Sequence, residues 1–301
     1  MSATTTPSWI AVDWGTTNMR AWAMSASGSV LAEACSDKGM GSLARDQFEA
    51  ALLDTIGPWL VGPTTIVACG MVGSRQGWVE APYAATPCPA LPEGLTRAPT
   101  QDPRLSVHVI AGIKQPAPAD VMRGEETQIA GFLALNKNWD GVICLPGTHT
   151  KWVHVSAGEV ISFQTYMTGE LYHVTSTQTV LRHTVAAGDG WDETAFLTGI
   201  ETAMARPERL AARLFSLRAE GLLNGMTGQT ARAQLSGLLI GAELAGAKPY
   251  WLGQQIAVIG DGTLSGHYVR ALAAQSAPAT QVNANAATLA GLTAAYRRLK
   301  G

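Results

Sequence analysis

Two short polar turns, each following an apolar run, carry the residue types that bind phosphate. The first turn begins after the apolar residues 10–12 and contains Asp13, Gly15, Thr16, Thr17 and Asn18. Glycine permits a tight turn and lets a ligand approach the backbone. The threonines and the asparagine supply short donors, and the aspartate can hold a hydrated metal ion. The stretch predicts a phosphate-and-magnesium site, and a surface hairpin with a polar tip is the alternative.

The second turn repeats this pattern in the other half of the chain. Its polar residues are Gly147, Thr148 and Thr150, and it leads to Lys151 and then a tryptophan. The first turn leads in the same way to an arginine and a tryptophan, although the spacing differs by two residues. Two such turns facing one another would grip a polyphosphate from both sides, which a lone hairpin cannot do. The likeness suggests an internal duplication but does not prove one.

Phosphoryl transfer also needs a base that orients the attacking hydroxyl. The candidates are the carboxylates of residues 120–128, which precede the second turn: Asp120, Glu125 and Glu126. Adjacent glutamates on a helix point about 100° apart, so only one can face a given pocket. Gly124 allows a close approach beside Glu125, which is therefore the predicted base. Solvated helix charges are the alternative for both glutamates.

A glycine-punctuated loop at residues 70–78 offers groups that suit an acidic substrate. Arg75 can bind a carboxylate through two hydrogen bonds, while Gln76 and Trp78 supply a hydrogen bond and an apolar wall. Arg123 is assigned to substrate binding with them. The alternative is a structural surface loop.

Two weaker patterns complete the candidates for chemistry. Gly260 and Gly262 follow a strand-like run and suit a nucleoside lying against glycine backbone. His149 and His154 lie five residues apart, which sends their side chains to opposite faces of a strand, so a zinc site is not expected.

The composition is that of a soluble globular protein. The chain has 301 residues, of which 47% are hydrophobic and 15% charged, and its formal net charge is −2. One large domain or two of about 150 residues are compatible with this length. No block of like charge suggests nucleic-acid binding, and no apolar run approaches the ~20 residues of a membrane span. The four cysteines lack metal-site spacing, and the start of the chain lacks a secretion signal, so a cytoplasmic protein with reduced thiols is expected.

Hydrophobic periodicity indicates that strands and helices follow one another in a similar order in both halves. In the first half we expect strands at 9–14, 19–25, 30–36, 64–69 and 105–110, helices at 46–60 and 120–135, and irregular structure at 81–103. In the second half we expect strands at 141–145, 152–155, 160–163, 256–259 and near Val282, with helices across 168–246, 265–275 and 286–299.

Taken together, these blocks resemble the 2-dehydro-3-deoxygalactonokinase family of bacterial sugar-acid kinases. The segments that carry the resemblance are 12–18, 69–78, 122–128, 145–152, 167–171 and 235–241. They extend over nearly the whole chain, and the blocks at 70–78 and 145–152 are the most particular to the family. Related sugar kinases carry a Gly-Asp pair at the catalytic position, where this chain has Gly124 and Glu125. The nucleoside glycines also depart from the usual doublet, because Asp261 separates them.

The resemblance implies an α/β fold of the actin/hexokinase/Hsp70-like ATPase superfamily. Two ribonuclease-H-like domains, residues 1–135 and 136–301, would face a central cleft that holds ATP and Mg²⁺. The N-terminal domain would carry the first phosphate turn and the sugar-acid site, and the C-terminal domain the second turn and the nucleoside site.

The implied reaction is the ATP-dependent phosphorylation of 2-dehydro-3-deoxy-D-galactonate at its C6 hydroxyl, in galactonate or galactose catabolism. We expect Glu125 to act as the base, Asp13 to hold magnesium through water, and Arg75 to bind the substrate carboxylate. The gluco epimer or another sugar acid is an alternative substrate, and a nucleotide-driven regulatory ATPase is an alternative function. The sequence leaves open whether the protein forms a homo-oligomer.

Overall fold

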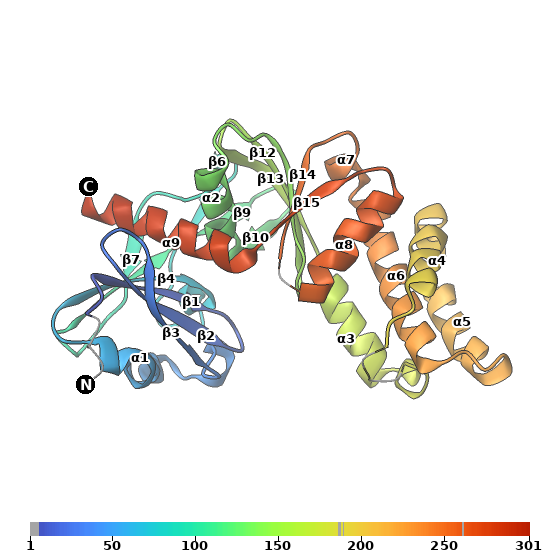
Figure 1. The fold of residues 1–301 in the computed structure, drawn as a ribbon, viewed down its shortest axis with the longest axis horizontal. Coiled ribbons are helices and arrows are strands. Elements are labelled where there is room, and N and C mark those ends of the chain that lie inside the picture. Colours follow the sequence, from blue (N-terminus) through green and yellow to red (C-terminus); the bar gives the residue numbers. More distant parts are fainter. Residues whose placement is uncertain (1–5, 186–187, 189, 261) are drawn as a thin grey trace. The chain divides into compact units, whose positions relative to one another are not determined.

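The computed structural model describes residues 6–185, 188, 190–260 and 262–301. The chain forms two compact units, labelled by element in Figure 1. Unit 1 comprises Met1–Trp139, Ser156–Ser162 and Ala284–Gly301, and unit 2 comprises Asp140–Val155 and Phe163–Asn283. The last helix of the chain therefore packs within the unit that contains its beginning. As a division into domains, the boundary after residue 135 stays a prediction.

Unit 1 is built on a six-stranded sheet. The strand order is β3-β2-β1-β4-β8-β7, with β1 antiparallel to β2 and parallel to β4. β2 pairs antiparallel with β3, and β4 parallel with β8. The bounds are β1 Trp9–Trp14, β2 Met19–Met24, β3 Val30–Ser36, β4 Thr64–Gly70, β7 Leu95–Arg97 and β8 Leu105–Ile110.

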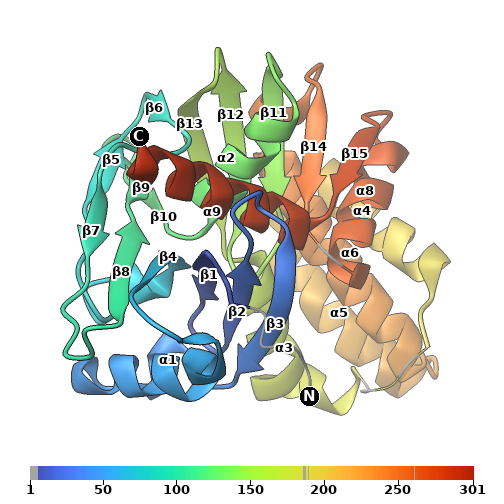
Figure 2. The same cartoon turned by 60° about the vertical axis from the view of Figure 1, so that its left-hand side comes forward.

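Helices cover both faces of this sheet, as Figures 1 and 2 show. On one face lies α1 (Phe48–Ile56), between the short 3₁₀ turns η2 (Arg45–Gln47) and η3 (Gly57–Trp59). On the other face lie α2 (Glu125–Leu135) and α9 (Ala284–Lys300), which cross closely. A Cβ at Gly131 of α2 would lie 1.8 Å from the carbonyl oxygen of Ala287 in α9, so only glycine permits this crossing.

The segment before α2 differs from the prediction in two places. The helix expected at 120–135 begins at Glu125, because Gly124 has a φ of 106° that no right-handed helix contains. Residues Asp120–Met122 instead form strand β10, which pairs with β9 (Gly112–Gln115) and through it with β5 (Tyr83–Ala85). Three short strands, β5, β6 (Cys88–Pro89) and β7, also interrupt the region 81–103, which was wrongly expected to be irregular.

Unit 2 repeats the sheet topology of unit 1. Its strands follow the order β15-β14-β11-β12-β13, with β11 antiparallel to β12 and parallel to β14, which is parallel to β15. This corresponds strand by strand to β8-β4-β1-β2-β3 of unit 1. The bounds are β11 Gly141–Leu145, β12 Thr150–Ser156, β13 Glu159–Tyr166, β14 Ile256–Ile259 and β15 Ala279–Val282. The repetition seen in the sequence is therefore a repetition of fold. The first residues of β13 belong to unit 1, where they pair with β6.

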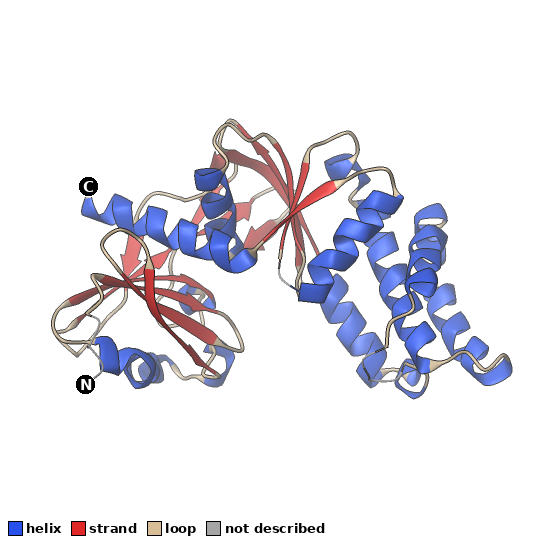
Figure 3. Ribbon diagram, viewed as in Figure 1, coloured by secondary structure: helices blue, strands red, loops and turns tan. Residues whose placement is uncertain are grey.

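The helices of unit 2 form a group beside its sheet, coloured blue in Figure 3. The helix α6 packs closely against α4 and also contacts α3, α5 and α8. The bounds are α3 Thr168–Gln178, α4 Glu193–Ala205, α5 Leu210–Leu223, α6 Gly228–Gly246, α7 Lys248–Trp251 and α8 Gly262–Ala274, with 3₁₀ turns η5 Val180–His183 and η6 Pro207–Arg209. Within the described residues, no helix combines the length and apolar character needed to cross a membrane. All four cysteines are free, and Cys69, Cys88 and Cys144 are buried.

Candidate active site

The carboxyl ends of β1 and β4 bring the predicted metal-binding aspartate into a polar cluster of unit 1. Asp13 is paired across the sheet with Arg20 on one side and with Cys69 on the other. Arg20 Nη2 donates to Asp13 Oδ2 at 2.6 Å, and the same guanidinium donates to the side chain of Asn285 at the start of α9. The Asp13 side chain keeps 21% exposure. It is thus an anchored carboxylate with one side open to solvent.

This environment fits a magnesium ion that keeps most of its waters. Among the described residues, no three His, Cys, Asp or Glu side chains form a cluster that would hold a metal alone. Magnesium in phosphoryl-transfer sites is commonly held by one or two carboxylates together with water and substrate phosphates. A single half-open carboxylate beside a phosphate-binding turn meets that requirement.

The first predicted phosphate turn is exposed and has free amide groups. Residues 16–18 are exposed between β1 and β2, and Gly15 N donates to Asn18 O at 2.9 Å. The carbonyl groups of Gly15 and Thr16 accept from the backbone of residues 40 and 41, which fixes the turn. No hydrogen-bond partner for the amides of Thr16 and Thr17 is found among the described residues. The turn can therefore donate to an anion.

Beside this turn, two glycines bring the start of α2 against the end of β4. Gly70 has a φ of 93°, and a Cβ there would lie 2.7 Å from the carbonyl oxygen of Trp14. A Cβ at Gly124 would lie 3.4 Å from the Gly70 Cα, so the two backbones are nearly in contact. Glu125 therefore begins its helix close to the strand ends that carry Asp13. Glu125 and Asp13 therefore lie near the same strand ends of unit 1, and their roles as base and metal carboxylate stay predictions.

The two adjacent glutamates have different environments. Glu125 is half-buried, and its Oε2 accepts from the backbone amide of Arg123 at 3.0 Å. Glu126 is 0% exposed and accepts from the Gly124 amide at 2.6 Å and the Thr127 hydroxyl at 3.0 Å. Burial and then the nearby charge of Glu125 raise the pKa of Glu126 to about 8. Of the two, only Glu125 retains surface for a substrate.

The loop at residues 70–78, which is predicted to recognise the acid, has an exposed tip and a buried remainder. Arg75 and Gln76 are exposed, and the Arg75 side chain, 82% exposed, lies 3.4 Å from Glu80. Trp78 is only 4% exposed and packs between Trp14 and Phe48. Its burial favours a packing role for Trp78, and the predicted apolar wall for substrate stays a prediction.

Arg123 lies beneath the same loop. It is 8% exposed, its Nη2 donates to Ala81 O at 2.7 Å, and its guanidinium lies 4.2 Å from the centre of the Tyr83 ring. Its Nη1 is buried without a hydrogen-bond partner, as is the Ser74 hydroxyl. Arg123 is thus a buried cation with unused donors.

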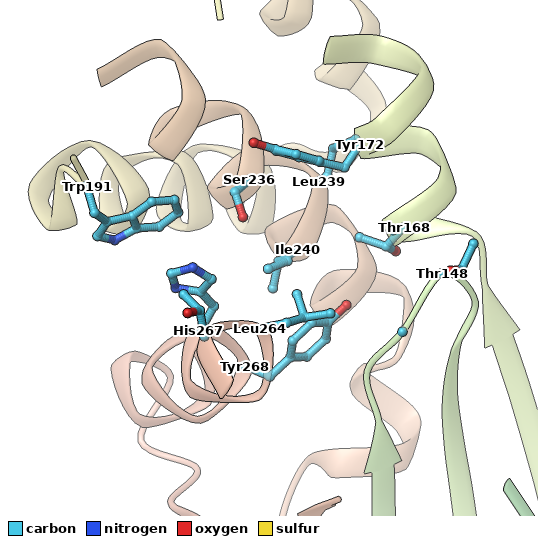
Figure 4. Close-up of a pocket in the computed structure, with 13 residues that line it drawn as sticks. Thr148, Thr168, Tyr172, Trp191, Ser236, Leu239, Ile240, Leu264, His267 and Tyr268 are labelled. Carbon is cyan, nitrogen blue, oxygen red and sulfur yellow. The ribbon is translucent and has the colours of Figure 1, made fainter. Parts of the chain in front are cut away.

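The second predicted turn opens onto a pocket that lies entirely in unit 2 (Figure 4). The pocket has a volume of about 350 Å³, within the range of small-molecule sites. Figure 4 shows Thr148 and Thr168 at one end and Trp191 with His267 at the other. Besides these four residues, the lining comprises Gly147, Gly169, Tyr172, Ser236, Leu239, Ile240, Thr263, Leu264 and Tyr268.

The end near Thr148 suits phosphate. Thr168 and Gly169, the first residues of α3, line the pocket together with the second turn, and Thr263 at the start of α8 lines it as well. Helix N-termini present unpaired amide groups and a partial positive charge, which attract anions. A Cβ at Gly169 would lie 2.3 Å from Gly147 O, so the turn and α3 are in close contact.

The opposite end of the pocket suits a planar base. The rings of Trp191 and His267 stack with centroids 4.0 Å apart and an angle of 24°. Burial, followed by the charge of Arg270, lowers the pKa of His267 to about 4, so the ring is neutral near pH 7. Arg270 Nη2 lies 2.6 Å from His267 Nδ1 and donates to it, which places the imidazole proton on Nε2.

The other predicted nucleotide residues of unit 2 are not part of the pocket lining. Thr150 is 0% exposed, and its hydroxyl lies 3.0 Å from the Tyr268 hydroxyl, which favours a supporting role in the wall, and its predicted phosphate contact stays a prediction. Lys151 is buried on β12, and Gly260 directly follows β14, where its amide donates to Val282 O. Gly262 begins α8, directly before the lining residue Thr263. Asp261 lies outside the described residues.

A buried carboxyl lies behind this wall. Glu243 accepts from Trp152 Nε1 and from the Tyr268 hydroxyl, both at 2.7 Å. Burial raises its pKa to about 7. Glu243 therefore holds two aromatic side chains in place, one of which lines the pocket.

Several lining residues were not predicted as site residues. Thr168, Gly169 and Ser236 fall inside segments that carry the family resemblance, so that resemblance could have indicated them. Tyr172, Trp191 and His267 lie outside those segments, and no local motif marks them.

Comparison with known proteins identifies the family. The family model for 2-keto-3-deoxy-galactonokinase matches residues 13–295. The chain belongs to this family. It is 39% identical over 304 residues to a probable 2-dehydro-3-deoxygalactonokinase of Rhizobium meliloti (strain 1021), covering 98% of this chain and 99% of that one. It is 34% identical over 296 residues to the 2-dehydro-3-deoxygalactonokinase of Escherichia coli (strain K12), covering 95% and 97%.

Solved structures agree on the fold of this family member. The crystal structure of a candidate 2-dehydro-3-deoxygalactonokinase from Sinorhizobium meliloti superposes with a TM-score of 0.91 at 37% identity, covering 97% of this chain and 99% of that one. Component A of the (R)-2-hydroxyglutaryl-CoA dehydratase of Acidaminococcus fermentans gives 0.53 at 11% identity, covering 97% and 99%, and shows the fold alone. The predicted α/β fold of the actin-like ATPases, with its ribonuclease-H-like sheet repeated in the chain, is confirmed, and so are the family and its kinase class.

Proposed function

We propose that the protein transfers the γ-phosphoryl group of ATP to the C6 hydroxyl of 2-dehydro-3-deoxy-D-galactonate, giving the 6-phosphate and ADP. The match to the 2-keto-3-deoxy-galactonokinase family over residues 13–295 carries this proposal. The pocket of unit 2, lined by the start of α3 and the second turn at one end and by stacked rings at the other, supports nucleotide use. A place in galactonate or galactose catabolism follows from that substrate, and we expect a cytoplasmic location, where ATP is supplied.

In the proposed reaction, the C6 oxygen attacks the γ-phosphorus. A bond forms between O6 and phosphorus, the bond from the γ-phosphorus to the bridging oxygen breaks, and ADP departs with that oxygen. The Glu125 carboxylate accepts the hydroxyl proton. The proposed phosphate donors are, taken separately, the backbone amides of Thr16 and Thr17 in unit 1 and those of the turn at Gly147 and Thr148, which lines the pocket of unit 2.

Asp13 would hold magnesium through water, and the ion would neutralise charge on the β- and γ-phosphates. This assignment rests on the anchored, 21% exposed carboxylate beside the first turn. On the acid side, Arg75, Gln76 and Arg123 are the proposed contacts, because they belong to the polar loop of unit 1 and the residue beneath it.

An ADP-release assay over a panel of sugar acids tests the proposal. We expect ADP formation to depend on added acid and to be fastest with the galacto compound. Faster turnover of the gluco epimer would move the substrate assignment to that epimer. ADP release that no acid stimulates would favour a regulatory ATPase and contradict the proposed kinase reaction.

A further inference from the structure

Arg123 is a buried cation whose counter-ion is missing from the described chain. The residue is 8% exposed, yet no described carboxylate forms an ion pair with its guanidinium. Its contacts are the Ala81 carbonyl, the Tyr83 hydroxyl at 3.3 Å and the Tyr83 ring. Removing a charge from water is costly unless an opposite charge or a full set of hydrogen bonds compensates. These neutral contacts leave Nη1 unused.

A second unsatisfied group lies on the loop at residues 70–78, next in sequence to a glycine that packs against Arg123. A Cβ at Gly73 would lie 2.9 Å from Arg123 Nη1, so the loop backbone lies directly against the guanidinium. The next residue, Ser74, is 5% exposed, and its hydroxyl is also buried without a partner. Buried polar groups are almost always hydrogen-bonded in native proteins, so an unsatisfied guanidinium nitrogen against Gly73 and an unsatisfied hydroxyl on the next residue indicate a missing partner. Two donors of this kind suit an anion.

From these contacts we infer that Arg123, together with the Ser74 hydroxyl, receives the carboxylate of the sugar acid. This inference rests on the proposed function. The exposed Arg75, which the sequence favoured for this role, already lies beside Glu80 and is 82% exposed, so an ion pair there is weakened by solvent. A guanidinium shielded from water binds a carboxylate more strongly and with a fixed geometry.

The position of Arg123 also matches the length of the substrate. Its backbone amide donates to the Glu125 carboxylate, while its guanidinium lies at the far end of the side chain. Five bonds join Cα to Cζ in arginine, and five bonds join C1 to C6 in a six-carbon acid; at about 1.5 Å per bond the two chains have similar reach. An acid held at the guanidinium can therefore extend its C6 hydroxyl toward Glu125.

The loop must shift for this contact to form. Nη1 has no accessible surface, and Gly73 of the 3₁₀ turn η4 (Met71–Gly73) lies against it. The acid reaches the guanidinium when this turn moves aside. Arg45 holds the outer part of the loop through the carbonyl groups of Arg75 and Gly77. The amides of Trp78 and Ala81 donate to the carbonyl groups of Val72 and Gly73, so the movement must break backbone hydrogen bonds of the turn.

The test compares the acid with its uncharged carboxamide as phosphoryl acceptors. For the wild-type protein we expect kcat/KM to favour the acid by on the order of 10- to 100-fold, the value of a hydrogen-bonded charge. In Arg123→Gln this preference should fall close to one, through a higher KM for the acid. Arg123→Lys keeps the charge and should keep part of the preference, while Ser74→Ala should raise the KM for the acid several-fold.

Two comparisons separate recognition from a structural role. Arg104→Gln, which removes an arginine paired with Asp102, should leave the preference for the acid intact. Arg75→Gln should reduce the preference less than Arg123→Gln. A purely structural Arg123 would lower stability and the turnover of acid and amide alike, with the preference unchanged.

An unchanged preference in Arg123→Gln and Arg123→Lys would overturn the inference while the kinase activity stands. If Arg123→Gln does not fold, an unchanged KM for the acid in both Arg123→Lys and Ser74→Ala would overturn it. A wild-type protein that phosphorylates no sugar acid would instead refute the proposed function itself.

Discussion

The buried carboxyl of Glu126 should make the protein less stable as the pH rises. In the folded state its pKa is about 8, because the side chain is 0% exposed and lies near Glu125, whereas the ordinary value is 4.5. Between these two values the unfolded chain loses the proton and the folded protein keeps it. The contribution of Glu126 to the unfolding free energy therefore falls as the pH rises from about 4.5 to about 8, and it is constant above pH 8.

The size of this effect follows from the two pKa values. Their difference is 8 − 4.5 = 3.5 units, which at about 1.4 kcal/mol per unit amounts to on the order of 5 kcal/mol. Glu126→Gln removes the titration. Its amide can still accept from the Gly124 backbone through its carbonyl oxygen, which preserves the shorter of the two hydrogen bonds.

Urea unfolding of both proteins at pH 5 and pH 8 measures the effect. We expect the unfolding free energy of Glu126→Gln, measured relative to that of wild type, to be several kcal/mol higher at pH 8 than at pH 5. This change is expected whatever the stability of the variant at pH 5. Comparing the two proteins removes the contributions of other titrating groups, including Glu243. A difference in unfolding free energy that is the same at both pH values would refute the assignment of a protonated Glu126 to the folded state.

Three further substitutions test the site and the packing. Glu125→Gln should lower kcat by on the order of 10²- to 10⁴-fold and by more than Glu126→Gln does, since a catalytic base is lost; wild-type turnover would contradict that role. Trp191→Ala should raise the KM for ATP roughly tenfold, the worth of a stacked base, with little change in the KM for the acid; an unchanged KM for ATP would exclude a stacking role. Gly131→Ala should lower the unfolding free energy by at least about 1–3 kcal/mol through overpacking against α9, whereas Gly62→Ala, which meets nothing within 4 Å, should stay near wild type; equal stability of the two would contradict the close crossing.

The buried strands were predictable because their signal is local. Apolar runs predict β1 at Trp9–Trp14 and β11 at Gly141–Leu145, and alternating apolar and polar residues predict β8 at Leu105–Ile110, with the bounds that the structure has. Strand β10 was missed because Asp120–Met122 is extended only through pairing with β9, a partner that no local pattern shows. The same reason explains the short strands between residues 81 and 103.

Candidate site residues could be read from the sequence where one turn or one helix start carries them, and their roles stay predictions. The first turn with Asp13, and Glu125 beside Gly124, are short segments whose chemistry is visible in the sequence. The pocket of unit 2 is different, because Thr148, Trp191, Ser236 and His267 come from separate elements that only the fold brings together. The sequence also does not show how far each side chain is exposed to solvent, so it does not distinguish the exposed Arg75 from the buried Arg123.

Identification of the product tests the central claim most directly. With ATP and 2-dehydro-3-deoxy-D-galactonate, phosphorus NMR of the wild-type reaction should show ADP and one new phosphate monoester in equal amounts, with the phosphorus coupled to the protons on C6. Inorganic phosphate as the only product besides ADP, or a phosphate carried on another carbon, would contradict the proposed reaction.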